Sequence, residues 1–328
     1  MYTIAGSLTA TVYIIPKNQR EHKFDYGLYK NFCKQKYCID NNESGDIKMK
    51  VIDTFQEIPG CYNNNQFDQH LWEAYAQKIA PGFAEKIKTD AADYNFEQDI
   101  LPVLNAVPQN GEQIKQAYDS FCKVTNQLEE KIKDKLDTEL DVDIVLYLGL
   151  CNGAGWATEL NGTPAVLLGV EKILELSWYG ERDMIGLIYH ELGHIWHFQT
   201  RSKDNQWTAK DRQQESQGRA LWQLYTEGVA MYIEHLLCGD ENFYHQDKGG
   251  WLDWCQRNRQ SLYAEFIRRI DRAESTQDFF GDWCNYQGRS DVGYYLGCEL
   301  VKELVREYSL KELADLSSDA IYQKLCKM

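Results

Sequence analysis

Two histidines four residues apart, His190 and His194, are the residues of this sequence best suited to holding a metal ion. They bound the segment His-Glu-Leu-Gly-His at 190–194, and residues four apart lie on one face of an α-helix, so both imidazoles can reach a single ion. The surrounding sequence has helical apolar spacing, and its apolar side centres roughly opposite the two histidines. That side is formed by Ile185, Ile188, Leu192 and Ile195.

Glu191 follows the first histidine and lies about 100° around the predicted helix from it. A carboxylate there can contact a water molecule on the metal without binding the metal itself. A bound metal lowers the pKa of water from 15.7 to about 7, and a neighbouring carboxylate can then take the proton. The segment therefore predicts a metal-dependent hydrolase with Glu191 as general base.

A second segment, Leu224–Tyr232, contains Glu227 followed by Gly228 and Ala230. With segment 190–194 it resembles the gluzincins, the metallopeptidase clan that includes thermolysin and the M1 aminopeptidases. In that clan the third zinc ligand is a Glu on the next long helix, so the resemblance implies Zn²⁺ held by His190, His194 and Glu227.

The spacing departs from the well-known gluzincins, because 32 residues separate His194 from Glu227. Glu215 lies nearer the usual distance, but it has no small neighbours and remains the alternative ligand. Gly228 and Ala230, facing Gly193, would let two helix backbones approach closely. Residues 201–211 resemble an inserted loop, and the whole pattern is similar to bacterial predicted zinc proteases of unknown substrate.

Other polar residues near these segments have weaker claims to a role. His197 lies on the histidine face but seven residues from His190, so we expect it to line the cleft or support a ligand. Gluzincins often carry an Asp four residues after the ligand Glu, where this chain has Met231. Glu234 is the nearest acidic candidate for a supporting partner.

Peptide hydrolysis also needs a group that stabilises the negative carbonyl oxygen. In the aminopeptidases this group is a Tyr three residues before a Gly, and here Tyr294 precedes Gly297 by three. The resemblance implies Tyr294 as this residue, with Tyr295 and Arg289 as alternatives. Ser290 and Asp291 are candidate N-caps of the helix that would begin there.

The resemblance also bears on substrate binding. It implies that the predicted strand 164–170 is an edge strand that pairs with a peptide substrate. Gly169-Val170-Glu171 faintly resembles the aminopeptidase segment whose Glu binds the substrate amine. The choice between endopeptidase and exopeptidase stays open.

The composition excludes some partners and leaves the substrate open. The formal net charge of −15 argues against nucleic acid and anionic membranes, since both would repel an acidic surface. The apolar start of the chain has no Lys or Arg before Lys17, which does not fit a signal peptide and favours a cytoplasmic location. The ten cysteines are scattered, and we expect reduced thiols.

The predicted fold is α+β and mostly helical. Residues 1–139 form a mainly helical N-terminal region with an initial strand at Thr9–Ile15, and 140–328 form a gluzincin-like zinc peptidase domain with a small sheet. Strands are predicted at 142–148 and 164–170, and helices at 67–79, 96–104 and 112–136, with helices almost throughout after Arg182.

The predicted function is zinc-dependent hydrolysis of a peptide or protein substrate. Two alternatives stay open. One is a zinc-binding regulatory protein without turnover, against which the intact Glu191 argues because metal binding alone does not need it. The other is a zinc hydrolase of non-peptide amides or esters, which would use the same attacking water.

Overall fold

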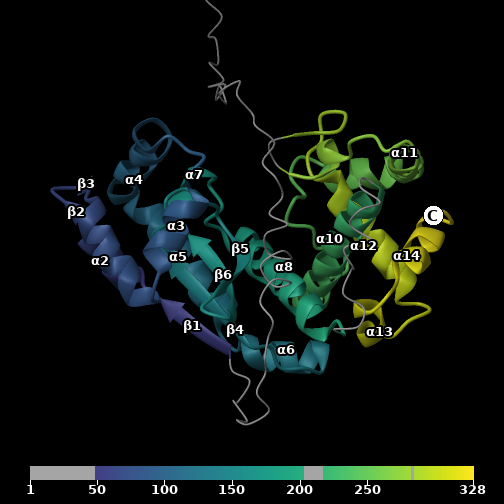
Figure 1. The fold of residues 1–328 in the computed structure, drawn as a ribbon, viewed down its shortest axis with the longest axis horizontal. Helices are drawn as coiled ribbons and strands as arrows, with labels where there is room; N and C mark the ends of the chain where they lie inside the picture. The colour runs from purple at the N-terminus through teal and green to yellow at the C-terminus, as the bar shows by residue number, and fades with distance from the viewer. Residues whose placement is uncertain (1–48, 203–216, 282–283) are drawn as a thin grey trace, which may run out of the picture. The chain divides into compact units, whose positions relative to one another are not determined.

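The computed structural model describes residues 49–202, 217–281 and 284–328 (Figure 1). Every described residue belongs to one compact unit, which spans Ser44–Met328. The predicted strand Thr9–Ile15 and the alternative ligand Glu215 lie outside the described residues.

The described part is α+β and mostly helical, as predicted. Before residue 140, two very short strands and a series of helices follow the first strand. They are β1 (Met49–Asp53), η1 (Phe55–Cys61), β2 (Tyr62–Asn63), β3 (Gln66–Phe67), α2 (Gln69–Ile79), α3 (Phe83–Asp90), η2 (Phe96–Ile100), α4 (Leu101–Ala106), η3 (Val107–Gln109), α5 (Gly111–Thr125) and α6 (Leu128–Leu136).

The helix predicted over 112–136 is two helices, so that prediction is wrong in one respect. Its apolar spacing persists on both sides of a break, which is why it looks continuous in the sequence. The break falls at Gln127, whose φ of 56° is left-handed and cannot continue a right-handed helix. The chain therefore turns between α5 and α6.

The main sheet has four strands in the order β1-β4-β6-β5. The predicted strands are confirmed as β4 (Val142–Tyr147) and β6 (Thr163–Gly169), which pair in parallel, while β5 (Trp156–Leu160) runs antiparallel to β6. Asn161 and Gly162 join β5 to β6 with φ of 52° and 90°, the positive values of a tight hairpin turn. This hairpin makes β6 an interior strand and β5 the edge, so the edge position predicted for 164–170 is wrong.

The sheet also crosses the division predicted near residue 139. β1 lies before that position and pairs along its whole length with β4, which lies after it. Residues on both sides belong to the same compact unit. The sheet is thus continuous across residue 139. A division at that residue stays a proposal, and it concerns only where the elements that carry the predicted site residues begin.

The C-terminal half is helical. Its elements are α7 (Val170–Glu175), α8 (Glu181–Thr200), α10 (Gln217–Cys238), α11 (Trp251–Asp271), η5 (Gln277–Phe279), α12 (Val292–Leu304), α13 (Leu310–Ala314) and α14 (Ser318–Leu325). α10 packs against both α8 and α12 (Figure 1). Within the described residues, no helix has both the length and the apolar character needed to cross a membrane.

Small residues let these three helices approach closely. A Cβ on Gly193 of α8 would lie 2.6 Å from the Cα of Ala230 on α10, which confirms the predicted facing of these two residues. Gly228 does not share that contact, contrary to prediction. A Cβ there would lie 2.2 Å from the backbone oxygen of Gly297 on α12, so Gly228 sets the contact between α10 and α12.

Gly228→Ala should therefore lower the free energy of unfolding by about 1–3 kcal/mol, the usual effect of overpacking against an atom that cannot move away. Chemical denaturation measures this change. Gly111→Ala at the start of α5 is the matched control, because a Cβ there meets nothing within 4 Å and should cause no loss. Equal stability of both variants and the wild type would refute the close packing of α10 on α12.

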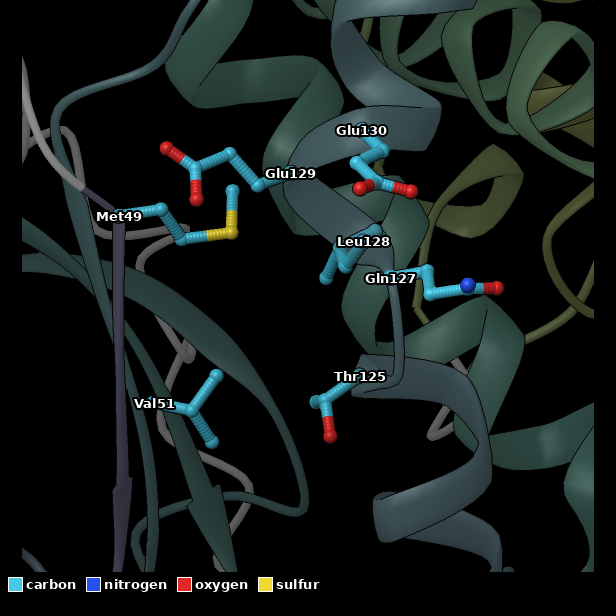
Figure 2. Close-up of a pocket in the computed structure, with 7 residues that line it drawn as sticks. All are labelled: Met49, Val51, Thr125, Gln127, Leu128, Glu129 and Glu130. Atoms are coloured by element: carbon cyan, nitrogen blue, oxygen red, sulfur yellow. The ribbon is translucent and has the colours of Figure 1, made fainter.

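A surface hollow lies at the sheet edge opposite β5 (Figure 2). Met49 and Val51 of β1 form one side, and the turn between α5 and α6 forms the other. Its lining residues are Met49, Val51, Thr125, Gln127, Leu128, Glu129 and Glu130. It contains none of the predicted site residues, of which Glu191 contacts β5 at the opposite edge of the sheet.

Candidate metal centre

His190, His194 and Glu227 come together where α8 and α10 pack. Nε2 of His190 lies 3.2 Å from Nε2 of His194 and 3.1 Å from Oε2 of Glu227. The third side of this triangle, from His194 Nε2 to Glu227 Oε2, measures 3.4 Å. Glu227 is 1% exposed and His190 is 6% exposed, so their polar atoms are largely removed from water.

This donor set fits a zinc-sized ion. Ligand atoms about 2.0–2.1 Å from a tetrahedral ion lie roughly 3.3 Å from one another. The three separations given above bracket that value. Two imidazoles and one carboxylate are also a known donor set of catalytic zinc sites. Among the described residues, these three form the one group of His, Cys, Asp and Glu side chains arranged to hold a metal.

The electrostatics of the triangle favour a charged carboxylate beside the imidazoles. Burial alone would raise the pKa of Glu227, but His194 and His190 outweigh it and hold that pKa at about 2. Burial lowers the pKa of His194, yet Glu227 outweighs this effect and the net pKa is raised. Glu227 is therefore anionic at neutral pH, ready to bind a cation.

Glu191 lies beside the triangle and outside it. Its Oε2 accepts a hydrogen bond of 2.8 Å from the backbone N–H of Ala157 on β5. The edge strand β5 thus fixes the carboxylate of Glu191 through a backbone hydrogen bond from outside α8. This contact between β5 and α8 is possible because the Asn161-Gly162 turn places β5 at the edge.

Glu234 lies behind the histidines, about two helical turns after Glu227 on α10. It is fully buried, and its Oε2 lies 3.8 Å from Nδ1 of His190. Its oxygens also accept hydrogen bonds of 3.0 and 3.1 Å from Nδ1 of His245. The sequence drew attention to Glu234 but not to His245, whose ring centre lies 5.7 Å from that of His190.

His245 belongs to the loop between α10 and α11, and no helical spacing connects it to the motif. The signal that places it is Gly186 on α8. A Cβ on Gly186 would lie 2.5 Å from the Cβ of His245, so only glycine leaves room for the loop. This pairing of a loop residue with a glycine could not be read from the sequence.

His197 does not line the metal centre. Its ring packs against Trp222 at 5.5 Å and Tyr225 at 5.6 Å, and it is 1% exposed. Burial lowers its pKa to about 3, so this imidazole is neutral. The expected cleft or supporting role is wrong because its face of α8, close to the helix end, turns into an aromatic cluster.

The two tyrosines of α12 diverge, as neighbours on a helix should. The ring centre of Tyr294 lies 5.4 Å from that of His190, whereas Tyr295 is 2% exposed and packs against Tyr244 and Trp251. Arg289 points its guanidinium to the carbonyl oxygen of Gly249 at 3.4 Å. Of the three candidates, Tyr294 is the one in contact with a histidine of the triangle.

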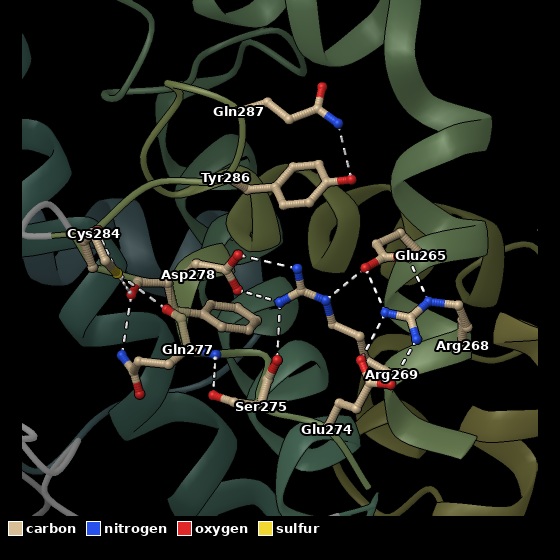
Figure 3. Close-up of polar contacts among 12 residues, drawn as sticks. Glu265, Arg268, Arg269, Glu274, Ser275, Gln277, Asp278, Cys284, Tyr286 and Gln287 are labelled. Atoms are coloured by element: carbon tan, nitrogen blue, oxygen red, sulfur yellow. Dashed lines mark hydrogen bonds and ion pairs between the residues drawn. The ribbon is translucent and has the colours of Figure 1, made fainter. Parts of the chain in front are cut away.

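The segment before α12 is anchored by an ion-pair network (Figure 3). Arg269 of α11 donates to Glu265 at 2.8 Å, to Asp278 at 3.1 Å and to the backbone oxygen of Ser275 at 2.9 Å. Its guanidinium also lies over the ring of Phe279, 5.2 Å from the ring centre. The network holds the loop that enters α12.

That loop backs Tyr294. The ring of Phe280 lies 6.0 Å from the ring of Tyr294, and a Cβ on Gly293 would lie 2.3 Å from it. Asp291 is the N-cap residue, as predicted, but its side chain accepts from the N–H of Gly281 at 2.8 Å and does not cap the helix. The predicted start of the helix is correct, and its capping bond is not formed.

Glu171 does not lie open to a substrate amine. It is 1% exposed, and both of its oxygens accept hydrogen bonds from backbone amides. The faint resemblance of 169–171 to an amine-binding segment is therefore not matched by the position of the side chain.

Comparison with known proteins agrees with the geometry. Residues 183–301, rather more than a third of the chain, match the family model described as M61 glycyl aminopeptidase. No curated protein and no solved structure matches the chain. The matched segment includes the whole His-His-Glu triangle together with Glu191 and Tyr294. This match and this triangle indicate a metallopeptidase, with a possible metal-binding triad consistent with that of the gluzincins.

Proposed function

We propose that this protein hydrolyses peptide bonds with a zinc ion held by His190, His194 and Glu227. The observation that carries the proposal is the triangle of ligand atoms, with sides of 3.1 to 3.4 Å, at the contact of α8 with α10. Zinc bound there would act as a Lewis acid and lower the pKa of water from 15.7 to about 7.

The residues around the triangle have complementary tasks in this proposal. Glu191 takes the proton of the attacking water and later gives it to the leaving amine. The Ala157 N–H fixes the direction of the Glu191 carboxylate through their 2.8 Å hydrogen bond. Tyr294, against His190, donates a hydrogen bond from its hydroxyl to the oxygen that becomes negative. Glu234, whose Oε2 lies 3.8 Å from Nδ1 of His190, is the anionic neighbour of that ring.

The substrate is an extended peptide that lies along β5. Because β5 pairs only with β6 among the described strands, its other side offers backbone groups for pairing. The resemblance implies this role for 164–170, but the hairpin makes β5 the edge strand, and β5 is the strand that contacts Glu191. A peptide on β5 would therefore run beside the general base.

A peptide library with free and with acetylated N-termini tests this function. The purified protein with zinc should cleave peptides, and a chelator should stop the cleavage. Because the matched family is described as an aminopeptidase, we expect faster removal of N-terminal residues from the free peptides. Cleavage of amide or ester substrates without any peptide cleavage would support the non-peptide hydrolase, and no turnover at all would support the regulatory alternative.

One zinc ion should bind per chain. Glu227→Gln removes a charged ligand and should weaken zinc binding by more than the ~10–100-fold that outer partners of ligands typically contribute. Elemental analysis after dialysis against a metal buffer measures this change. Glu241→Gln, an exposed carboxylate after the same helix, is the control and should keep its zinc. Full zinc retention in Glu227→Gln would exclude Glu227 as a ligand.

A further inference from the structure

One buried carboxylate contacts two backbone amides of the loop Leu148–Gly155, which joins β4 to β5. Tyr75 and Trp72 fix the start of this loop at Leu148, and Asn152 donates to the carbonyl oxygen of Ile87. Glu171 of α7 accepts a hydrogen bond of 2.7 Å from the N–H of Gly149 and one of 3.0 Å from the N–H of Cys151. The side chain is 1% exposed, so water cannot replace either bond. A carboxylate with two backbone donors inside a protein is a strong fixed contact.

The loop is shaped around this carboxylate. A Cβ on Gly149 would lie 2.5 Å from Oε1 of Glu171, and a Cβ on Gly169 would lie 2.5 Å from the backbone oxygen of Gly153. Cys151 has a φ of 62°, a left-handed conformation that a non-glycine residue keeps only when its surroundings hold it. The hydrogen bond from Cys151 to Glu171 is such a restraint.

The loop leads directly to the general base. The N–H of Gly169 donates to the carbonyl oxygen of Ala154 at 3.2 Å, which ties the end of the loop to β6. Ala157, three residues after Ala154, donates its N–H to the carboxylate of Glu191. We infer that Glu171 is a positioning residue, whose carboxylate fixes the 148–155 loop and through it the Ala157 N–H that orients Glu191. The effect on turnover rests on the proposed function, whereas the effect on the loop does not.

The ionisation of Glu171 gives this contact a pH dependence. Burial raises the pKa of Glu171 to about 7, against the opposing effect of its backbone donors and of Lys172. The other ionisable groups that interact with it include a tyrosine on each of three elements and the thiol in the loop. They are Tyr62, Tyr75, Tyr147 and Cys151, and burial raises the pKa of each, so all four are neutral near pH 7.

The direction of the pH effect follows from these states. Above about pH 7 the carboxylate is ionised and holds both amides strongly. Below it, protonation removes the charge and weakens both bonds. Lys172 is paired with Glu175 at 2.6 Å and keeps its charge throughout this range. The loop should therefore be more ordered at pH 8 than at pH 6.

Glu171→Gln tests the inference, with Glu175→Gln on the same helix as control. In Glu171→Gln, the backbone N–H of either Gly149 or Cys151 faces the side-chain NH₂ group of the glutamine and loses its hydrogen-bond acceptor. At pH 8, hydrogen exchange at residues 149–157 should be at least about tenfold faster than in the wild type, the effect expected from losing one hydrogen bond to a charged group. After correction for intrinsic rates, the wild type should lose protection between pH 8 and pH 6, and the variant should not.

Turnover is the second measurement. Glu171→Gln should keep its zinc and its KM while kcat falls about 10–100-fold, as misplacement of a catalytic group does. Unchanged exchange in the variant would overturn the inference, as would faster exchange with unchanged kcat. If the wild type cleaves no peptide, the proposed function fails, and hydrogen exchange at residues 149–157 still decides whether Glu171 holds the loop. If the variant does not fold, the pH dependence of exchange in the wild type decides it.

Discussion

Glu191→Gln should keep its zinc and lose at least the ~10²–10⁴-fold in kcat that a general base contributes. The amide has the same shape and can still accept the hydrogen bond from Ala157, so the local structure should persist. It cannot take a proton from water, which removes the chemical step. Glu191 is not part of the ligand triangle, and the metal should therefore be unaffected.

The control for this substitution is Glu181→Gln, at the start of the same helix, where the carboxylate pairs with Lys123 near solvent. It should match the wild type in kcat and zinc content, both measured on metal-loaded protein. Full activity of Glu191→Gln would show that another group takes the proton. Loss of zinc together with activity would show that Glu191 belongs to the metal site.

The core of the site could be predicted from the sequence because it is local. The i, i+4 spacing of His190 and His194 fixes their relation on one helix, and the small residue Ala230 beside Glu227 indicates a helix that packs on Gly193. These facts depend on a few neighbouring residues. The contact of Ala230 with Gly193 follows, and so does the position of Glu227 within reach of both imidazoles.

The surroundings of the site could not be predicted because they join segments far apart in the chain. Glu191 accepts a hydrogen bond from β5, and His245 lies in a loop that packs against Gly186. The carboxylate of Glu171 is hydrogen-bonded to backbone amides of the loop before β5. One local signal was available. Asn161-Gly162 between strand-forming residues is the usual sequence of a tight hairpin turn, and it would have placed β5 at the edge.

Tyr294→Phe should lower kcat about a thousandfold with little change in KM or zinc content. The substitution removes one hydroxyl and leaves the ring that packs between His190 and Phe280. If that hydroxyl donates to the developing oxyanion, its loss weakens a bond made only in the transition state, which appears in kcat. Removing one such donor typically costs about 3–4 kcal/mol.

Tyr295→Phe is the matched control, since the next residue on α12 points into the cluster of Tyr244 and Trp251. Removal of the Tyr295 hydroxyl should change the free energy of unfolding slightly and kcat little. A kcat loss in Tyr295→Phe and not in Tyr294→Phe would mean that the Tyr-to-Gly spacing of the aminopeptidases does not apply to this chain. If neither variant loses kcat, the oxyanion donor does not lie on α12. His245, which shares Glu234 with His190, would then be the next residue to test.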